Sequence, residues 1–489
     1  MKYYIGADLG TSALKLMLLD SDKNIINTVT KTYTVEYPHP GWSEQSPEFW
    51  WDAFVSGTKE LLSGVDKSLV SGIGVAGQMH GLVILDNKDN VIRPAILWND
   101  GRTSKETDYL NTVIGKDKLS EYTANIAFAG FTAPKILWVA ENERDNFDRI
   151  SKIMLPKDYI NYCLTGVHAT DYSDASGMLL LDVKNKCWSK TMLDECKVKE
   201  DQMPKLFESY ECIGTVLPGI AAELGISDKT VVVAGAGDNA ASAVGMSVVG
   251  AGGCNISLGT SGTVFIASDK FSVDKNNALH SFCHADGGYH LMGCILSAAS
   301  CNKWFCDEIL KTDDYKSEQK DINDDMLGNN DVFFLPYLMG ERSPINDTDA
   351  TGMFIGLRPD TKRDKMLLAV LEGVAFAIRD NVEIAKSLGI NIPESTVCGG
   401  GARSALWVKI LSNVLNLKLC VPMTEEGPGL GAAQLAMVGA GEYKTVFDSV
   451  KTEIKETISP DNEISARYEE KYKKFREIYP AVKELYKKL

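Results

Sequence analysis

The sequence contains the same four residues, Leu-Gly-Thr-Ser, at 9–12 and again at 258–261. In each copy an extended apolar run enters the tetrapeptide and another leaves it, which predicts two strands joined by a tight turn. Glycine gives the backbone freedom that such a turn needs, and the tip exposes backbone N–H groups and two hydroxyls. These donors suit a phosphate group, so we expect each copy to form a phosphate-holding hairpin.

The two copies lie 249 residues apart in a chain of 489 residues. This spacing is close to half the chain and favours an internal duplication. We therefore expect two related domains, residues 1–247 and 248–489, that face each other with one hairpin each. Two ordinary hairpins that converged on a common turn sequence remain an alternative, because Gly, Thr and Ser are frequent turn residues.

The residue before each copy differs, since Asp8 precedes the first and Ser257 the second. Only the first half therefore offers a carboxylate next to its hairpin. This asymmetry is expected if one divalent cation is held on one side of a nucleotide that the two domains share.

Composition limits the classes of function. The length exceeds what one hydrophobic core usually serves, which agrees with two domains. The net charge of −15 argues against a nucleic-acid partner. No apolar run is long enough to span a membrane, and Asp8 stands where a signal peptide would be apolar, so we expect a cytoplasmic protein.

The cysteines and histidines give no clear metal signal. Eleven cysteines with no Cys-x-x-Cys pair suggest reduced thiols. A group in the second half contains His280, Cys283, His284 and His290, but its spacing fits no familiar zinc pattern. We interpret these four as loop and core residues.

Polar groups follow two predicted strands of the first half. The strand 71–76 ends in Gly77-Gln78-Met79-His80-Gly81, and the strand 95–98 ends in Asn99-Asp100-Gly101-Arg102. Side chains at strand ends on a rigid scaffold are positioned like ligand contacts, and these could hold the hydroxyls of a small polyol. A satisfied histidine in one turn and a solvated second turn remain the alternatives.

Asp238 lies in a strand-to-helix turn. The buried-strand run 230–234 leads into Gly235-Ala236-Gly237-Asp238-Asn239-Ala240, which matches Gly-x-Gly-x-x-Ala, the dinucleotide-binding pattern. Against that interpretation, no acidic residue for a ribose follows about 20 residues later, and a carboxylate inside the pattern would repel a pyrophosphate. We therefore interpret Asp238 as a catalytic residue that glycine neighbours leave accessible.

The second half contains a further glycine turn. We expect the charged stretch 311–331 to be a surface insertion and residues 364–388 to form a long helix. Residues 397–404 then predict a strand, a turn of three glycines and the start of a helix. The glycines would let adenosine lie against the backbone. An amphipathic helix from Asn462 closes the chain, bent or stopped near Pro480. No P-loop and no protein-kinase motif set is present.

With these motifs assembled, the chain resembles the FGGY carbohydrate kinases over nearly its whole length, and within them it is most similar to the members that phosphorylate D-xylulose. The motifs that carry the resemblance are 7–12, 77–81, 97–102, 130–142, 155–159, 237–240, 257–262 and 399–404. One departure is Lys365, where the family usually has an acid or amide. We expect Lys365 on a helix surface, where it does not affect the chemistry.

The resemblance implies an α/β fold with two homologous ribonuclease H-like domains, of the actin, hexokinase and Hsp70-type ATPase kind, and a catalytic cleft between them. It implies ATP-dependent phosphorylation of D-xylulose, with Asp238 as the general base and Asp8 next to Mg²⁺ and the phosphates. The sugar contacts would be Met79, His80, Trp98, Asn99, Asp100 and Asp238. The ATP contacts would be Thr11, Ser12, Gly259, Thr260, Ser261, Gly400, Gly401 and Ala402.

Two other functions stay open. A sister kinase for another ketose, polyol or sugar acid would keep the fold and the role of Asp238. An ATP-driven chaperone or filament subunit would use the same scaffold without a sugar pocket, and a chaperone would need a client-binding domain that we do not expect after the closing helix. Nucleic acid and membrane are not expected partners, and a homodimer is left open.

Overall fold

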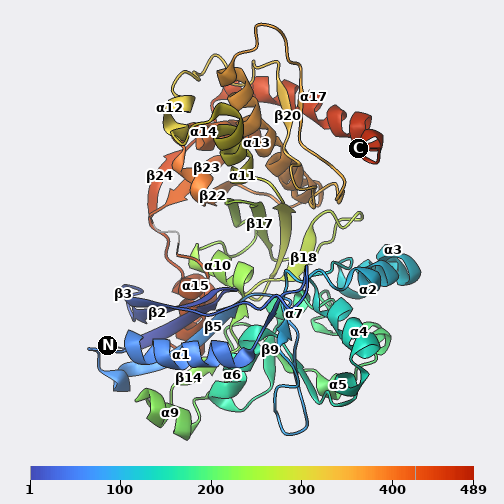
Figure 1. The fold of residues 1–489 in the computed structure, drawn as a ribbon. Coiled ribbons are helices and arrows are strands. Elements are labelled where there is room, and N and C mark those ends of the chain that lie inside the picture. Colours follow the sequence, from blue (N-terminus) through green and yellow to red (C-terminus); the bar gives the residue numbers. More distant parts are fainter. Residues whose placement is uncertain (1, 424–425, 489) are drawn as a thin grey trace.

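The computed structural model describes residues 2–423 and 426–488, which form two lobes joined near the middle of the molecule (Figure 1). The first hairpin forms as expected: β1 (Tyr3–Leu9) pairs antiparallel with β2 (Ala13–Asp20), and Leu9 lies opposite Leu14. The first sheet then has the order β13-β14-β5-β1-β2-β3, with β15 paired to β5. The other strands are β3 (Ile25–Thr32), β5 (Val70–Gly77), β13 (Cys212–Thr215), β14 (Val231–Val233) and β15 (Ala236–Gly237).

The second hairpin also forms as expected, from β16 (Cys254–Leu258) and β17 (Gly262–Ser268). The second sheet has the order β18-β19-β17-β16-β22-β23-β24. Its other strands are β18 (His280–Cys283), β19 (Tyr289–Ile295), β22 (Glu394–Cys398), β23 (Lys418–Pro422) and β24 (Ile454–Ile458).

The two sheets repeat one topology. The path β3-β2-β1-β5-β14-β13 corresponds strand by strand to β19-β17-β16-β22-β23-β24. The directions correspond as well, because β1 and β16 are each antiparallel to the next strand in sequence and parallel to β5 and β22 respectively. This repetition confirms the predicted duplication and the two-domain fold.

Alternation along β1 determines what each face of the first sheet meets. Ile5 and Ala7 pack in the cluster that contains Trp50 of α1 (Pro47–Leu61), whereas Tyr4 packs against Met437 of α15 (Pro428–Gly439). In Figure 1, α1 and α6 (Pro156–Thr165) lie on one side of the blue strands, and α10 (Asp238–Gly245) and α15 lie on the side toward the second lobe. The side chain of Asp8 shares the face of Tyr4, which is the face covered by α15.

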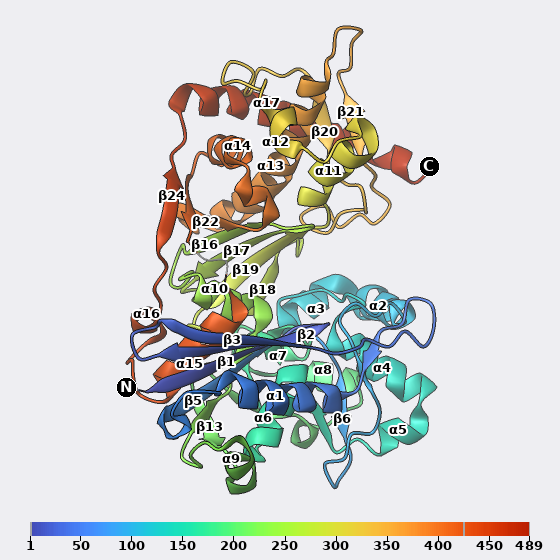
Figure 2. The same cartoon turned by 60° about the vertical axis from the view of Figure 1, so that its left-hand side comes forward.

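The helix α15 comes close to this face and to α10 at positions where glycines carry no side chain. A Cβ atom added to Gly6 would lie 1.9 Å from the carbonyl oxygen of Gly429, and one added to Gly431 would lie 1.9 Å from that of Ala241 in α10 (Asp238–Gly245). The helix α10, which is rich in small residues, therefore packs closely against α15. The helix α15 follows residue 248 in sequence but covers the first sheet (Figure 2). The boundary between residues 247 and 248 itself stays a prediction.

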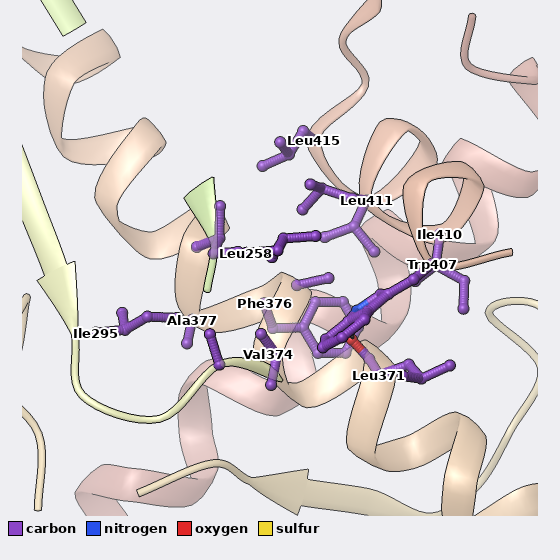
Figure 3. Close-up of a cluster of buried hydrophobic side chains, with 14 of the residues drawn as sticks. Leu258, Ile295, Leu371, Val374, Phe376, Ala377, Trp407, Ile410, Leu411 and Leu415 are labelled. Carbon is purple, nitrogen blue, oxygen red and sulfur yellow. Dashed lines mark hydrogen bonds between the residues drawn. The ribbon is translucent and has the colours of Figure 1, made fainter. Parts of the chain in front are cut away.

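The core of the second lobe reaches the tip of its hairpin. Figure 3 shows Leu258, the last residue of β16, meeting side chains of α13 (Arg363–Ser387) and α14 (Ala405–Leu415). The indole Nε1 of Trp407 in α14 donates a hydrogen bond of 3.0 Å to the carbonyl oxygen of Leu371 in α13. The hairpin is thereby tied to the two helices that flank the glycine turn.

The first lobe holds the second through the β18–β19 hairpin. The amide group of Asn125 exchanges two hydrogen bonds with the backbone of Ser281, at 2.9 Å and 3.2 Å. The backbone N–H of Cys283 donates to Ser176 Oγ over 3.0 Å, and Phe282 and Met292 pack in the core of the first lobe. This contact joins the lobes on one side of the molecule.

Several local predictions need correction. The helix expected to start at Ser46-Pro47-Glu48 and to carry Phe49, Trp50 and Phe54 inward forms as α1, in which Trp50 and Phe54 are buried but Phe49 is only half-buried. The strand expected over 95–98 is limited to β7 (Ala95–Ile96). For the closing helix α17 (Asn462–Tyr486) the sequence predicts a bend or a stop near Pro480; the helix continues through Pro480, so the stop is wrong and the bend stays a prediction. Tertiary packing of Phe475 and Tyr486 on either side offsets the missing backbone donor.

The remaining elements are short or surround these layers. None of the helices among residues 2–423 and 426–488 is long and apolar enough to cross a membrane. The remaining strands are β4 (Glu44–Gln45), β6 (Val83–Leu85), β8 (Lys152–Met154), β9 (Ala169–Asp171), β10 (Leu181–Asp182), β11 (Cys187–Trp188), β12 (Lys205–Phe207), β20 (Phe333–Leu335) and β21 (Met353–Ile355). The remaining helices are α2 (Ser104–Tyr109), α3 (Lys116–Thr123), α4 (Thr132–Asn142), α5 (Arg144–Asp148), α6 (Pro156–Thr165), α7 (Tyr172–Ser176), α8 (Lys190–Glu195), α9 (Pro218–Leu224), α11 (Ala299–Trp304), α12 (Tyr315–Gln319) and α16 (Val446–Ser449).

Candidate active site

Asp8 lies near the end of β1, opposite Lys15 on β2. The Lys15 ammonium group forms an ion pair with Glu426, which precedes α15. Burial raises the pKa of Asp8 to about 6, with Lys15 acting to lower it and Glu426 to raise it. The site thus combines a partly buried carboxylate, a cation and a second carboxylate, and hard oxygen ligands of this kind fit Mg²⁺ shared with phosphate groups.

The tip of the first hairpin is braced by neighbouring side chains. Thr11 Oγ1 donates to Gln78 Oε1 over 3.2 Å and accepts from Trp98 Nε1 over 3.0 Å. The hydroxyl of Tyr33 donates to the Gly10 carbonyl oxygen over 2.6 Å. Ser12 is exposed at the tip. Bracing of this kind fixes the backbone donors before any ligand arrives.

Asp238 is the first residue of α10, immediately after β15 brings the chain alongside Gly77 of β5. Its Oδ1 accepts hydrogen bonds from the backbone and the side chain of Asn239, at 2.7 Å and 3.0 Å. Burial raises the pKa of Asp238 to about 7, and the like charge of Asp8 adds to the rise. The two aspartates are therefore close enough to interact, and Asp238 has a pKa suited to a general base near neutral pH.

His80 has a fixed tautomer. Its Nδ1 lies 2.7 Å from the carbonyl oxygen of Gly177, and since a carbonyl only accepts, Nδ1 carries the proton and Nε2 is left as an acceptor. Burial and the nearby Lys135 and Arg342 lower the pKa of His80 to about 3, so the ring is neutral. A neutral Nε2 can accept a hydrogen bond from a hydroxyl group.

The backbone of His80 is held in the left-handed region, with φ of 70°. Its carbonyl oxygen accepts from Lys135 Nζ over 2.8 Å and from Thr132 Oγ1 over 3.1 Å. Burial lowers the pKa of Lys135 to about 7. Met79, the preceding residue, packs against Gly237, where an added Cβ would lie 3.0 Å from its Sδ. The predicted sugar contacts Met79 and His80 thus adjoin the turn that carries Asp238.

The three residues predicted after β7 lie in different settings. Trp98 is 47% exposed and its indole reaches Thr11, and Asn99 is exposed. The carboxylate of Asp100 is buried and accepts from Arg102 Nε and Nη2, at 2.8 Å and 2.7 Å, and from the Ser43 backbone N–H. Asp100 therefore holds the loop, and direct contact with a substrate stays a prediction.

The glycine turn of the second lobe lies against the second hairpin. A Cβ added to Gly399 would lie 2.8 Å from the backbone of Leu258, and one added to Gly401 would lie 2.9 Å from the Trp407 ring, whereas Gly400 has open space. Together these elements line a pocket of about 980 Å³ that contains Thr260, Gly400, Gly401 and Ser404. The other predicted ATP contacts of this lobe, Gly259, Ser261 and Ala402, are not among the residues that line this pocket. The Gly259 carbonyl oxygen accepts from the N–H of Ala299, which does line it, Ser261 is exposed at the hairpin tip, and Ala402 packs on the core.

The pocket has a wall that the sequence did not predict. The stretch 311–331, expected to be a surface insertion, forms α12, and five residues of the stretch line the pocket. Gln319 Oε1 accepts from the hydroxyl of Ser404 over 2.6 Å, which connects α12 to the start of α14. Asn302 and Lys303 of α11 form another part of the lining. No pattern within 311–331 distinguishes a pocket wall from a solvated loop.

The sequence patterns also did not predict Lys15, Glu426 and Arg342 as residues of the site. Lys15 could have been found, because the hairpin register places it opposite Asp8. Glu426 gave no signal, being 411 residues from its partner. Arg342 comes from the second lobe, and its guanidinium group lies 5.1 Å from the ring of Phe128 and close enough to His80 to lower its pKa. The group His280, Cys283, His284 and His290 is buried in β18, β19 and the turn between them, where the histidine rings contact Phe265 and Phe282.

Comparison with known families and proteins agrees with this geometry. The model of the FGGY family of carbohydrate kinases, N-terminal domain, matches residues 3–245, and that of the C-terminal domain matches residues 254–440. The chain belongs to the FGGY family of carbohydrate kinases. Membership of this kinase family disfavours the chaperone and filament alternatives.

Curated FGGY relatives cover nearly the whole chain. The chain is 40% identical to the xylulose kinase of Escherichia coli (strain K12) over 479 residues, which are 97% of this chain and 98% of the relative. It is 34% identical to the xylulose kinase of Bacillus subtilis (strain 168) over 490 residues, which are 99% and 98% of the two chains.

Solved FGGY structures share the arrangement of both lobes. A xyloylose kinase from Brucella ovis superimposes with a TM-score of 0.94 at 40% identity, covering 99% of this chain and 100% of that one. A ligand-bound xylulose kinase and a gluconate kinase, both from Lactobacillus acidophilus, each give a TM-score of 0.93 at 25% identity; each covers 100% of this chain, and 100% and 99% of its own. Fold similarity alone therefore does not choose the sugar.

Proposed function

We propose that this protein phosphorylates D-xylulose at its 5-hydroxyl with ATP as the donor. The observation that carries the proposal is the 40% identity, over almost the full length of both chains, to a curated xylulose kinase. The geometry supports the chemistry, because Asp238, whose pKa is raised to about 7, interacts with Asp8 near the tip of the β1–β2 hairpin, which is expected to hold phosphate.

In this proposal Asp238 accepts the proton of the sugar 5-hydroxyl. At the same time the oxygen of that hydroxyl forms a bond to the γ-phosphorus of ATP, and the bond from this phosphorus to the leaving ADP breaks. The oxygen attacks as the proton leaves, so the base need only be close and deprotonated. Phosphoryl transfer depends above all on positioning and on neutralising charge. Mg²⁺, when bound, would supply that neutralisation at the phosphates.

The sugar is held by the first lobe and the nucleotide mostly by the second. Met79 and the Nε2 acceptor of His80 contact the sugar, with Trp98, Asn99 and Asp100 around it. Thr11 and Ser12 in the first hairpin, and Gly259, Thr260 and Ser261 in the second, donate to phosphate oxygens, and Gly400, Gly401 and Ala402 bound the adenosine. Asp8 would hold Mg²⁺, directly or through its bound water, and Lys15 faces the same phosphates.

A sugar-acid kinase is the second candidate. It is favoured by Arg342, which lies near His80 and whose guanidinium group makes no ion pair with any carboxylate of the described residues. An unpaired cation near His80 would attract a carboxylate on the sugar.

A coupled ADP-release assay over a panel of acceptors tests both candidates. D-Xylulose should give a higher kcat/KM than D-ribulose, glycerol, L-fuculose or gluconate. A higher value for gluconate would favour the sugar-acid kinase, and a higher value for any other acceptor would assign the protein to another branch of the family.

The two aspartates are tested separately. Asp238→Asn should lower kcat by about 10²- to 10⁴-fold while sugar and ATP still bind, because asparagine keeps the shape and the bonds from Asn239 but cannot accept the proton. Raising magnesium should not restore it. Asp8→Asn should instead raise the magnesium concentration needed for half-maximal rate, and its defect should ease as magnesium rises. If Asp238→Asn kept kcat within a few-fold, Asp238 would not be the base.

A further inference from the structure

A fully buried ionic cluster lies beneath the candidate site. Lys157 Nζ lies 2.7 Å from Asp158, 3.0 Å from Asp171 and 3.7 Å from Asp174, and all four side chains have no exposed surface. Three carboxylates around one ammonium group are not neutral, and an uncompensated buried charge is costly. Burial and the neighbouring carboxylates raise the pKa of Asp174 well above its ordinary range.

Asp171 is the member that connects the cluster to its surroundings. One of its oxygens, Oδ2, accepts from Ser173 Oγ over 2.5 Å and from Ser209 Oγ over 2.7 Å. The other oxygen, Oδ1, is the one that faces Lys157. The two serines thus donate to the same carboxylate oxygen in almost the same way.

Both serines contact the turn that carries Asp238, but among the described residues only Ser173 does so through its hydroxyl. Ser209 uses its backbone carbonyl oxygen, which accepts from the Gly235 N–H over 2.9 Å and is retained in alanine. The backbone N–H of Gly237 donates to Ser173 Oγ over 3.1 Å. A hydroxyl has one proton, and because Ser173 gives it to Asp171, its lone pairs are left for the Gly237 N–H. The hydrogen bonds therefore have a fixed direction, from Gly237 through Ser173 to Asp171, and Asp171 also accepts from Lys157.

The same cluster supports the sugar loop. A Cβ added to Gly77 would lie 2.9 Å from the Cβ of Lys157, so the backbone that leads to Met79 and His80 rests on this lysine. Gly77 and Gly237 are themselves paired between β5 and β15. The sugar loop after β5 and the turn after β15 that carries Asp238 therefore leave the sheet side by side, next to Lys157.

We propose that Ser173 is a positioning residue for Asp238: held by Asp171 and Lys157, it fixes the Gly237 peptide and thereby the direction in which the Asp238 carboxylate points. This inference rests on the proposed function, in which Asp238 is the base. It assigns the reaction a residue that does not itself touch the substrate.

The chain offers a matched pair of variants. Ser173→Ala and Ser209→Ala each remove one hydroxyl that donates to Asp171 Oδ2, but only Ser173→Ala removes the acceptor of the Gly237 N–H. We expect Ser173→Ala to lower kcat by about 10- to 100-fold, because small misplacements of a reacting group cost that much, with the KM for ATP unchanged. Ser209→Ala should keep kcat within about threefold, and the two variants should have similar melting temperatures.

A double-mutant cycle separates positioning from general damage. In an Asp238→Asn background, Ser173→Ala should cause no further loss of the residual rate, because there is no base left to position. Equal losses of kcat in Ser173→Ala and Ser209→Ala, or independent losses from Ser173→Ala and Asp238→Asn, would overturn the inference. A nearly silent Asp238→Asn would instead overturn the proposed base, so the two failures are distinguishable.

Discussion

Asp238 shows how a site residue can reduce the stability of the fold that carries it. Its pKa is raised to about 7, first by burial and then by the like charge of Asp8. A carboxyl group in the unfolded chain ionises near pH 4. Between these two values the unfolded state loses its proton before the folded state does, so rising pH favours unfolding.

The stability of the protein should therefore respond to Asp238→Asn in a pH-dependent way. Asparagine does not ionise, so the variant should gain stability relative to the unmodified protein as pH rises from 5.5 to 8, by about 1 to 2 kcal/mol, and the gain should level off above the folded pKa. Urea unfolding of the ligand-free protein at the two pH values measures this. Asp228→Asn, at an exposed carboxylate, is the control and should show no such change. A pH-independent difference for Asp238→Asn would contradict the raised pKa.

At the scale of elements, the contact of α15 with β1 and α10 depends on the absence of side chains. Gly6 on the strand faces the backbone of Gly429, and Gly431 on the helix faces that of Ala241. Backbone atoms cannot move aside as a flexible side chain can, so these contacts tolerate no added methyl group. The same contact keeps Asp8 close to the start of α15.

A methyl group at Gly6 tests this packing. We expect Gly6→Ala to destabilise the protein by about 3 kcal/mol, because the new Cβ would lie 1.9 Å from the Gly429 oxygen. Gly219→Ala in α9 is the matched control, since nothing lies within 4 Å of its added Cβ and alanine favours a helix. Thermal unfolding should show a lower melting temperature for the first and an unchanged or higher one for the second. Equal melting temperatures would refute the close contact.

At the scale of the whole molecule, the candidate site is divided between two lobes. Asp8, His80 and Asp238 belong to the first sheet and its loops, whereas Thr260 and Gly400 belong to the second. The β18–β19 hairpin already binds the first lobe through Asn125 and Ser176. A ligand that touches both lobes should therefore rotate them about this contact.

Small-angle scattering tests such closure. The radius of gyration should be smaller with D-xylulose and a non-hydrolysable ATP analogue together than in the ligand-free protein. The reason is that the two bound ligands then contact both lobes and draw them together. Each ligand added alone provides the control, with a smaller change expected. An unchanged radius with both ligands would indicate a site that is formed in advance.

The sequence by itself determined the parts that depend on neighbours along the chain. Both hairpins, the strand-to-helix turn at Asp238 and the glycine turn at 399–401 could be predicted, because turn chemistry and the alternation of apolar residues act over a few residues. The repeated tetrapeptide extended these local signals to two domains, and the matching sheet topologies confirmed the duplication.

Only the tertiary structure decided which distant residues meet. Lys15 pairs with Glu426 across 411 residues, Arg342 of the second lobe lies near His80 of the first, and α15 covers a sheet formed hundreds of residues earlier. Ser173 lies 64 residues from Gly237, and nothing in either segment specifies the other. A sequence pattern reflects interactions between residues that are close along the chain. These contacts depend instead on how the two sheets and the helices between them pack against one another.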